Sequence, residues 1–315
     1  MHVEPETSPT SIWVLTDGKA GDVAQCIGVA EALGAPVSER TIATRPPFSW
    51  RLPFGPTDPR EWETRPGSPI APPYPDIAIA SGRRAAAYLR RIKRRSGGRT
   101  FTVFLKDPRT GPDSADLIWV PEHDRLRGRN VLVTPTSPHR FSPQKLAGLR
   151  ADKTPDIDRL AHPRVAVLIG GDSRHHTFTE SDQNRLLNGL RTMASADGAS
   201  FMITASRRTP PALAYGLSSL AKSGGHLFWT GDAPNPLGHF LAKADAIVAT
   251  ADSTNMIGEA AATGKPLHVF HPTGGHNKIT AFLTRLERMG VIHPFPGTLK
   301  TTTYEPIDAT PVIAD

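Results

Sequence analysis

The chain has 315 residues and a net charge of +7 at pH 7, from 37 lysines and arginines against 30 aspartates and glutamates. Its 38% content of hydrophobic residues is typical of a globular protein, and no apolar run approaches the roughly 20 residues that cross a bilayer as a helix. The single cysteine, Cys26, excludes an internal disulfide and a cysteine-cluster metal site. The length predicts two domains of roughly 150 residues each.

The basic balance favours an anionic partner, such as a nucleotide, a phosphorylated lipid or an anionic membrane. The sequence holds no zinc-finger, RNA-recognition or basic-zipper pattern, so we expect no nucleic acid as a partner. Residues 1–11 lack the basic start and apolar core of a signal peptide, and a lone cysteine suits a reducing compartment. We therefore expect a cytoplasmic protein that can lie peripherally at the inner membrane surface.

The first half of the chain alternates short apolar runs with longer amphipathic ones. The predicted strands are Ile12–Thr16, Asp76–Ala80, Phe101–Leu105, Leu117–Val120 and Val131–Thr134, and the predicted helices are Ala20–Leu33 and Arg83–Arg95. Most of the short runs are apolar throughout, which is typical of parallel strands covered on both faces. The repetition of strand and helix indicates βαβ units.

The segment Ala43–Pro75 interrupts this pattern. It holds ten prolines together with Phe48, Trp50, Phe54 and Trp62. Because proline fixes φ and lacks an N–H donor, we expect neither a central strand nor a long helix here. Two interpretations stay open: a flap that binds an acceptor or touches a membrane, or a mobile insertion whose tryptophans cover the domain.

The second half repeats the alternation. Its predicted strands are Val165–Ile169, Phe201–Ala205, Leu227–Thr230, Ala246–Thr250 and Leu267–Phe270, and its predicted helices are Glu180–Ala196, Ala212–Lys222, Met256–Ala262 and Lys278–Met289. The polar stretch Gln144–Pro163 separates the two series, so we expect an N-terminal domain of residues 1–155 and a C-terminal domain of residues 156–315. The sequence thus predicts an α/β fold of two Rossmann-like domains whose parallel sheets face a cleft.

A glycine turn follows the first predicted strand and opens the first predicted helix. It contains Asp17, Gly18, Lys19, Gly21 and Asp22. Backbone N–H groups and the positive end of a helix meet at such a turn and favour an anion, and doubly wound sheets bind ligands at this edge. The spacing is that of neither a dinucleotide nor a Walker motif. A turn that merely needs glycine remains the alternative.

Arg83 and Arg84 stand at the next strand–helix turn. Seven basic residues and no acidic one occur between Arg83 and Arg95, opposite an apolar stripe. This basic face either binds an anionic lipid or a phosphorylated acceptor, or is an ordinary solvated surface. The two arginines at the turn are the better candidates for a binding site.

Two loops at strand ends in the second half carry residue types that hold a diphosphate. Glycines let a ligand approach the backbone closely, and guanidinium groups pair phosphate oxygens in a fixed fork. Plain turns and plain surface arginines would explain the same pattern. The residues that we expect to contact the ligand are Gly170, Gly171, Asp172, Ser206, Arg207 and Arg208.

The most informative turn follows the fourth predicted strand of the second half. Asp252, Ser253 and Asn255 can cap the following helix, which begins at Met256, and leave its N–H groups facing a diphosphate. Glu259 lies one turn further on, where a carboxylate would repel phosphate and accept hydrogen bonds from a ribose diol. A simple N-cap and a surface charge are the alternative.

These motifs resemble the family named for elongated-mitochondria fission proteins, whose bacterial members look like glycosyltransferases. The resemblance spans nearly the whole chain, although the family pattern has a proline and a histidine where Ala20 and Asp22 stand. The matching stretches are Trp13–Gln25, Pro75–Arg84, Gly170–Ser173, Ser206–Pro210 and Ala244–Pro266.

The stretch Ser253–Gly264 also resembles the donor segment of GT-B glycosyltransferases. That resemblance implies a donor nucleotide on the C-terminal domain and an acceptor on the N-terminal domain. It assigns Glu259 to the ribose, and Ser253 with Asn255 to the diphosphate. It implies no metal and no cofactor, because the nucleotide sugar is a substrate and helix ends with basic side chains neutralise the leaving group.

We therefore expect transfer of a sugar from a nucleotide-sugar donor to a hydroxyl of a lipid- or glycan-linked acceptor, with peripheral contact to an anionic membrane. A base in the N-terminal domain would take the hydroxyl proton, and Asp22, Asp17 and His139 are the candidates. The alternatives are a non-catalytic adaptor at a membrane surface, related to mitochondrial fission proteins, and an enzyme that epimerises or hydrolyses the nucleotide sugar.

Overall fold

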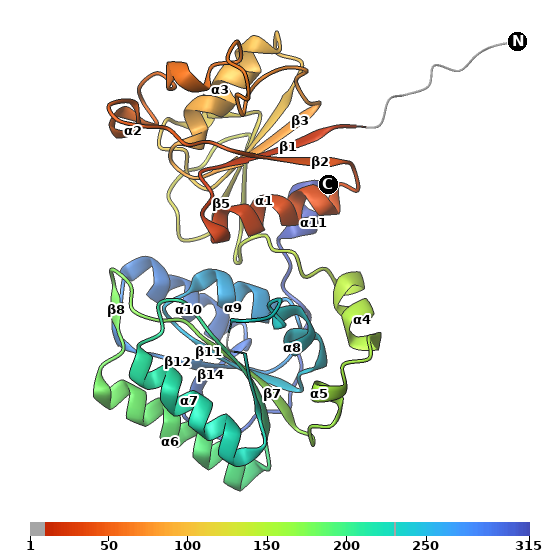
Figure 1. Ribbon diagram of the computed structural model, residues 1–315, viewed down its shortest axis with the longest axis vertical. Coiled ribbons are helices and arrows are strands. Elements are labelled where there is room, and N and C mark those ends of the chain that lie inside the picture. The colour runs from red at the N-terminus through yellow and green to blue at the C-terminus, as the bar shows by residue number, and fades with distance from the viewer. Residues whose placement is uncertain (1–9, 230) are drawn as a thin grey trace, which may run out of the picture. The chain divides into compact units, whose positions relative to one another are not determined.

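The computed structural model describes residues 10–229 and 231–315, which form two compact units (Figure 1). The first unit consists of residues 10–140 and Ala309–Asp315, and the second of Phe141–Asp308. The second unit therefore begins after Arg140, whereas the polar stretch Gln144–Pro163 predicts a boundary after residue 155. Helix α4 (Pro143–Ala151), which lies in that stretch, packs on α8 (Leu237–Lys243) in the second unit.

The first unit is built on a six-stranded parallel sheet with strand order β2-β1-β3-β4-β5-β6. Side chains of β1 alternate: Trp13 and Leu15 join the core under α3 (Ala85–Arg95), whereas Ile12 and Val14 join the core under α1 (Ala20–Ala32). Burial of both faces explains the unbroken apolar run. The strand bounds are β1 Ile12–Thr16, β2 Val37–Thr41, β3 Ile77–Ser81, β4 Phe101–Leu105, β5 Leu117–Pro121 and β6 Val131–Thr134.

The last residues of the chain complete the first unit. Helix α11 (Thr310–Ala314) lies beside α1, and Ala309 and Ile313 are buried in the same core as Val14 (Figure 1). The Thr310 hydroxyl ties this helix to His139, because Oγ1 accepts from the His139 N–H and donates to its carbonyl oxygen, both at 3.0 Å. The first unit is thus made of two separate stretches of chain.

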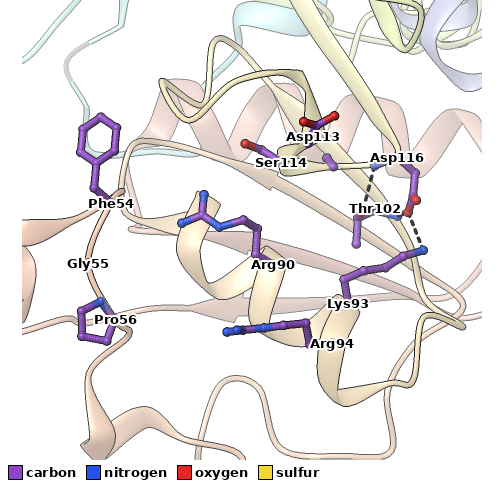
Figure 2. Close-up of a pocket in the computed structure, with 11 residues that line it drawn as sticks. Phe54, Gly55, Pro56, Arg90, Lys93, Arg94, Thr102, Asp113, Ser114 and Asp116 are labelled. Atoms are coloured by element: carbon purple, nitrogen blue, oxygen red, sulfur yellow. Dashed lines mark hydrogen bonds and ion pairs between the residues drawn. The ribbon is translucent and has the colours of Figure 1, made fainter.

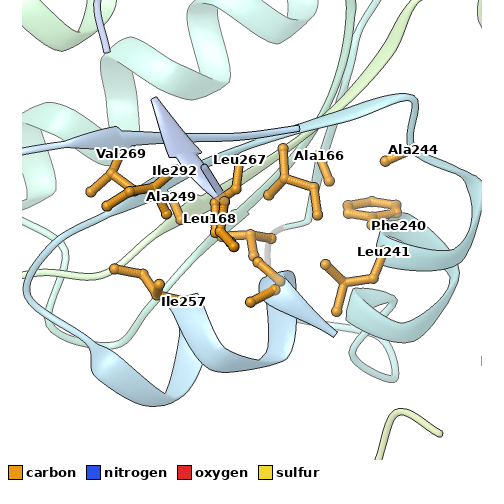
Figure 3. Packing of buried hydrophobic residues seen from close by; sticks show 14 of the residues in the cluster. Ala166, Leu168, Phe240, Leu241, Ala244, Ala249, Ile257, Leu267, Val269 and Ile292 are labelled. Atoms are coloured by element: carbon orange, nitrogen blue, oxygen red, sulfur yellow. The ribbon is translucent and has the colours of Figure 1, made fainter. Parts of the chain in front are cut away.

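The second unit repeats the architecture, with strand order β10-β9-β7-β11-β12-β14 in a parallel sheet. Helices α6 (Glu180–Asp197) and α7 (Pro211–Gly224) cover one face. Helices α8, α9 (Thr254–Ala261) and α10 (Asn277–Arg288) cover the other, where Phe240, Ile257 and Leu267 pack together (Figure 3). The strand bounds are β7 Arg164–Ile169, β9 Ser200–Ala205, β10 Leu227–Trp229, β11 Ala246–Thr250, β12 Leu267–Phe270 and β14 Ile292–Phe295.

Small elements complete both units. A two-stranded antiparallel ribbon joins β8 (His176–Thr177) to β13 (Thr273–Gly274), and α5 (Pro155–Asp158) precedes β7. The proline-rich segment holds only α2 (Phe48–Arg51) and the 3-10 turn η1 (Pro59–Glu61), and a second such turn, η2 (Pro112–Ser114), precedes β5. Within the described parts of the chain, no helix is both long and apolar enough to span a bilayer.

The prediction of two doubly wound parallel sheets is confirmed, and every strand predicted from an apolar run is present. Thr230, the predicted end of one strand, lies outside the described residues, as do residues 1–9. The edge strands β2 and β14 were missed. Strand β2 alternates exposed and half-buried residues, and β14 contains Pro294, so neither shows a continuous apolar run.

The proline-rich segment packs on α3 through a network of buried polar groups. The Tyr88 hydroxyl contacts the Thr44 hydroxyl at 2.9 Å and the Glu61 carboxylate at 2.5 Å, and it accepts from the Asp58 N–H at 3.2 Å. Hydrogen bonds from the Arg60 side chain lower the pKa of Asp58 to about 2. Irregular backbone here is thus stabilised by side-chain hydrogen bonds in place of a strand ladder.

Candidate functional site

Each sheet reverses its strand order next to its first strand. In the first unit the chain leaves β1 to form β2 on one side and then β3 on the other, and in the second unit β9 and β11 flank β7 in the same way. Loops at the carboxyl ends of the strands separate at such a reversal and leave room for a ligand. Most of the residues predicted from the sequence lie at these two positions.

In the second unit, the loop after β7 and the turn after β11 are in direct contact. A methyl group added at Gly170 would lie 2.2 Å from Asp252 Oδ2, and one added at Gly171 would lie 2.0 Å from the Arg208 carbonyl oxygen. Close packing of three loops therefore requires glycine at both positions. This reason differs from the one expected from the sequence, which is the close approach of a ligand to the backbone.

The Asp252 side chain is fully buried and joins those three loops. Its Oδ1 accepts from the Thr250 hydroxyl at 2.7 Å, and its Oδ2 accepts from the Gly171 N–H at 3.0 Å and from Arg208 Nη2 at 3.1 Å. Arg208 Nη1 also donates to the carbonyl oxygens of Gly171, at 3.0 Å, and Asp172, at 2.8 Å. Asp252 and Arg208 thus hold the site together, and their polar atoms are largely occupied.

The neighbouring predicted residues also stabilise the turns. Asp172 Oδ1 accepts from the Phe178 N–H at 2.8 Å, and the Ser206 hydroxyl accepts from the Arg208 N–H at 3.2 Å. The Arg207 side chain is different: it is exposed, and no partner contacts it among the described residues. Arg207 is therefore the arginine of this loop that is available to a ligand.

The start of α9 presents a polar end at the same edge. Ser253 is the N-cap, and its Oγ accepts from the Met256 N–H at 3.4 Å. Acidic residues are absent from the first turn of α9, and the Asp252 carboxylate that precedes the N-cap is paired with Arg208. Asn255 is half-buried in this same turn.

Glu259 lies one turn further along α9 and is half-buried. Burial raises the pKa of its carboxyl group to about 7. No hydrogen bond or ion pair to this carboxylate occurs within residues 10–229 and 231–315, so the charged form is poorly compensated there.

In the first unit, the turn after β1 and the loop after β3 meet at Gly82. A methyl group added at Gly82 would lie 3.3 Å from Asp22 Oδ2 and 3.4 Å from Asp17 Oδ1, so the two carboxylates converge on one small volume. The Asp17 side chain is 5% exposed, and Lys19 Nζ lies 2.9 Å from its Oδ2. Asp17 Oδ1 is buried without a hydrogen-bond partner among the described residues.

Lys106 belongs to this site and was missed by the sequence interpretation. It follows β4, and its Nζ forms an ion pair with Asp22 Oδ1, while the Ser81 hydroxyl lies 3.1 Å from the same oxygen. Its φ of 101° is rare for a residue with a side chain. Such a conformation costs roughly 1–3 kcal/mol and is retained mainly where function or packing demands it. The signal in the sequence was its place directly after an apolar strand, at the same edge as Thr16 and Ser81.

The other residues predicted for this unit lie further out or deeper. Gly18 has a φ of 81° and turns the chain toward α1, in which Gly21 lies. Arg83 is exposed and Arg84 is half-buried at the start of α3. His139 is buried, and its carbonyl oxygen packs on α1 at Gly28, six residues beyond Asp22. That separation is about 9 Å along a helix, so the contact of the His139 backbone with α1 lies away from Asp22.

Four histidines of the second unit form two pairs of neighbouring rings. The rings of His175 and His276 lie 4.4 Å apart, and those of His268 and His293 lie 5.6 Å apart. Burial lowers the pKa of His268 to about 4. In the part of the chain that the structure describes, no group of three or more histidine, cysteine or acidic side chains is arranged to hold a metal ion.

The model of the family described as "Mitochondrial fission ELM1" matches residues 20–315. The chain belongs to this family. A member from Arabidopsis thaliana, "Mitochondrial fission protein ELM1", is 27% identical over 263 residues, which cover 75% of this chain and 61% of that protein.

Solved structures place this ELM1-family chain in the GT-B-like fold class. The UDP-GlcNAc 2-epimerase from Methanocaldococcus jannaschii matches with a TM-score of 0.58 and 10% identity over 97% of this chain and 98% of the epimerase chain. A second structure of that epimerase, described as a complex with UDP-GlcNAc and UDP, matches with a TM-score of 0.52 and 11% identity over 97% and 98%. The resemblance inferred from the sequence, to this family and to this fold, is confirmed.

Proposed function

We propose that this chain transfers a sugar from a nucleotide-sugar donor to a hydroxyl of a lipid- or glycan-linked acceptor. The observation that carries the proposal is Glu259, a half-buried carboxylate with a raised pKa and no partner among the described residues. A buried acid without a partner costs free energy, so a ligand that donates hydrogen bonds would explain its position. The two hydroxyls of a ribose are such donors.

The surroundings of Glu259 support a nucleotide as that ligand. The start of α9 at Ser253 offers backbone N–H groups to a diphosphate, and the exposed Arg207 would add positive charge. The M. jannaschii epimerase that shares the fold is described in complex with UDP-GlcNAc and UDP. This supports a nucleotide sugar as the class of donor.

In the proposed reaction, the bond between the sugar C1 and the diphosphate oxygen breaks, and its electron pair leaves with the diphosphate. The acceptor oxygen bonds to C1, and its proton passes to a carboxylate of the first unit. Positive groups fixed before the reaction would stabilise the charge that develops on the leaving group. The acceptor would be bound by the first unit, and the chain would meet an anionic membrane as a peripheral protein.

Asp17 is the better supported proton acceptor of the three predicted bases. Lys19 pairs with its Oδ2, but its Oδ1 has no partner among the described residues. Asp22 Oδ1, by contrast, contacts both Lys106 and Ser81, and the His139 backbone packs on α1 at Gly28. We therefore expect Asp17→Asn to abolish transfer while leaving donor binding unchanged. Unchanged transfer would eliminate Asp17 and leave Asp22 as the next candidate.

The proposal is tested by thermal unfolding with UDP-, GDP-, ADP- and CMP-sugars. A ligand at 100 times its dissociation constant adds about 2.7 kcal/mol to the free energy of unfolding. We expect stabilisation by one nucleotide class, its loss in Glu259→Ala, and its retention in Glu305→Ala, which removes an exposed glutamate from a loop. Stabilisation by no nucleotide would contradict the proposal and favour a non-catalytic adaptor.

A second candidate, epimerisation of the nucleotide sugar, is favoured by the TM-score of 0.58 to the epimerase. The two reactions differ in what they release. Transfer yields free nucleotide diphosphate only when an acceptor is added, whereas epimerisation yields the isomeric nucleotide sugar without one. Chromatography of the nucleotide products after incubation with and without acceptor separates them.

A further inference from the structure

A surface of the first unit exposes two aromatic side chains. Trp50, in α2, and Phe54, in the turn that follows, are 75% and 74% exposed. Exposed apolar side chains that gather on one segment mark an interaction surface more often than isolated ones do. In the second unit, Tyr215 on α7 is equally exposed at 79% and serves as a natural comparison.

The turn that carries these aromatics is firmly packed. Leu52 is buried in the core under α3, and the Gly55 N–H donates to the Arg51 carbonyl oxygen at 2.8 Å. Arg90 Nη2 donates to the Pro53 carbonyl oxygen at 2.6 Å. The chain therefore holds Trp50 and Phe54 out in solvent on a packed turn, and their exposure is not explained by a loose loop.

A hollow of about 580 Å³ lies between this turn and α3 (Figure 2). Arg90 and Arg94 line it together with Phe54, and they lie four residues apart on α3, a spacing at which like charges repel. Within the described residues no carboxylate pairs with either arginine. Burial and the nearby Arg94 lower the pKa of Arg90, as expected for positive charge that lacks a counter-ion.

The remaining cations of α3 each have a carboxylate partner, although two of them share one glutamate. Arg91 and Arg95 both pair with Glu63, and Lys93 pairs with Asp116 at 2.8 Å. Asp113 also lines the hollow, from the η2 side. Arg90 and Arg94 are therefore the arginines of α3 that lack a carboxylate partner among the described residues, and the exposed Arg51 precedes this hollow next to Trp50 in the sequence.

Exposed aromatics beside arginines that lack a carboxylate partner match the chemistry of an anionic bilayer surface. Tryptophan and phenylalanine enter the boundary between headgroups and acyl chains, and arginines contact lipid phosphates. A soluble anion would be bound by the arginines alone and would leave the aromatics unexplained. The combination favours a membrane over a free phosphate.

We propose that the surface formed by Trp50, Arg51, Phe54, Arg90 and Arg94 docks onto anionic phospholipid bilayers. The aromatic rings enter the headgroup boundary, and the exposed guanidinium group of Arg94 binds lipid phosphates. Arg90, which is half-buried and hydrogen-bonded to Pro53 and Thr110, adds positive charge to the surface. The surface supplies the membrane contact of the proposed function but does not depend on sugar transfer, so each can fail without the other.

Sedimentation with large vesicles tests the proposal on the full chain. We expect binding to phosphatidylcholine vesicles that contain about one third phosphatidylglycerol, and much weaker binding to phosphatidylcholine alone. Binding should weaken as salt is raised, because lipid charge is screened over about a Debye length. Trp50 emission should shift to the blue on binding, and Trp50→Phe should remove that shift.

The variants Trp50→Ser/Phe54→Ser should lose most vesicle binding, whereas Tyr215→Ser should retain it. Arg94→Glu should weaken binding by at least about five-fold, which corresponds to about 1 kcal/mol for one basic residue at a lipid surface. Arg288→Glu, an exposed arginine of α10, makes the same change in net charge and should have little effect.

Four results would overturn the proposal: equal binding to neutral and anionic vesicles, no binding to either, full binding by the double aromatic variant, or equal losses in Arg94→Glu and Arg288→Glu. Stabilisation by inorganic phosphate without vesicle binding would also overturn it, by assigning the hollow to a soluble anion. Thermal stabilisation by nucleotide sugars in the double aromatic variant reports separately on the donor site, so failure of the surface is distinguishable from failure of the proposed transfer.

Discussion

Arg208 Nη2 lies 3.1 Å from Oδ2 of the fully buried Asp252 carboxylate, and this ion pair joins the loop after β9 to the turn after β11. The same carboxylate accepts from the Gly171 N–H, so three strand ends meet at one side chain. Arginine and aspartate at these positions could be taken for ligand-binding residues from the sequence alone. Their contacts indicate instead that they fix the shape of this edge of the sheet, and they leave Ser253, Arg207 and Glu259 as the candidates for contact with a ligand.

Asp252→Asn should lower the free energy of unfolding by about 1–3 kcal/mol, because the amide cannot accept every hydrogen bond that the carboxylate accepts. We expect a smaller loss of stability than for a fully buried ion pair, because the Arg208 side chain is 47% exposed. Urea unfolding followed by circular dichroism measures the change. Asp156→Asn breaks the exposed pair with Arg159 and should cost less than about 1 kcal/mol. Equal effects in the two variants would contradict the structural role of Asp252.

Gly170→Ala should be more destabilising than its single methyl group suggests. The added carbon would lie 2.2 Å from the Asp252 carboxylate, which is fully engaged and cannot move without breaking its hydrogen bonds. Overpacking of this kind costs about 1–3 kcal/mol. Gly148→Ala, in α4 with open space around it, should be neutral or stabilising by about 0.5–1 kcal/mol. Thermal unfolding of both variants checks the opposite signs.

The sequence predicted the positions of the sites better than the roles of their residues. Continuous apolar runs located the strands, and the polar residues after them lie at the carboxyl edges of two sheets, as expected for parallel βαβ units. The sequence could not distinguish a glycine that accommodates a ligand from Gly170, which accommodates Asp252, because that distinction depends on which loops touch.

Long-range packing was also invisible in the sequence. Helix α11 returns to α1 because Ala309 and Ile313 fill a core formed some 300 residues earlier, and nothing local to 309–315 indicates its partner. The sequence did not indicate a role for Lys106, for a similar reason. Its strained backbone and its pairing with Asp22, 84 residues away, appear only once β1, β3 and β4 lie side by side.

The strain at Lys106 can be measured separately from its ion pair. Lys106→Ala and Lys106→Gly both remove the amine, so the difference between them reports the backbone alone. Because φ is 101°, the glycine variant should be more stable than the alanine variant by about 1 kcal/mol. At the helical position Lys222 the order should reverse, with glycine less stable by about 1 kcal/mol. Denaturant midpoints of the four variants test this, and the same order at both positions would refute it.

The pairing of Lys106 with Asp22 should appear as coupling in a double-mutant cycle. Lys106→Met and Asp22→Asn each remove one partner, and the double variant should be less destabilised than the sum of the two by about 1 kcal/mol. The value is modest because the lysine side chain is 42% exposed and solvent screens the pair. Additive losses in urea unfolding would show that the two residues act independently.

Two groups of the second unit whose pKa is shifted by burial should give opposite pH dependences of stability. The pKa of His268 is about 4 in the folded chain, against 6.5 for an unperturbed histidine. The stability that neutral His268 contributes is therefore complete above pH 6.5 and is lost as the pH falls toward 4, because between these values only the unfolded state takes up the proton. His268→Gln should flatten this acid loss relative to the parent chain in urea titrations between pH 4 and 7.

The pH dependence of stability contributed by Glu259 has the opposite sign. Burial raises the pKa of its carboxyl group from 4.5 to about 7, so the folded state holds its proton longer than the unfolded state does. The stability that this group contributes is complete below pH 4.5 and falls as the pH rises to about 7, by up to about 3 kcal/mol. The difference in free energy of unfolding between the parent chain and Glu259→Gln isolates this contribution and should change over that window.

If the carboxylate binds ribose hydroxyls, a saturating nucleotide sugar should stabilise the parent chain more at pH 8 than at pH 5.5, and this gain should disappear in Glu259→Gln. A pH-independent difference between the two chains would mean that the Glu259 carboxylate is solvated, and the argument for a buried ribose acceptor would fail with it.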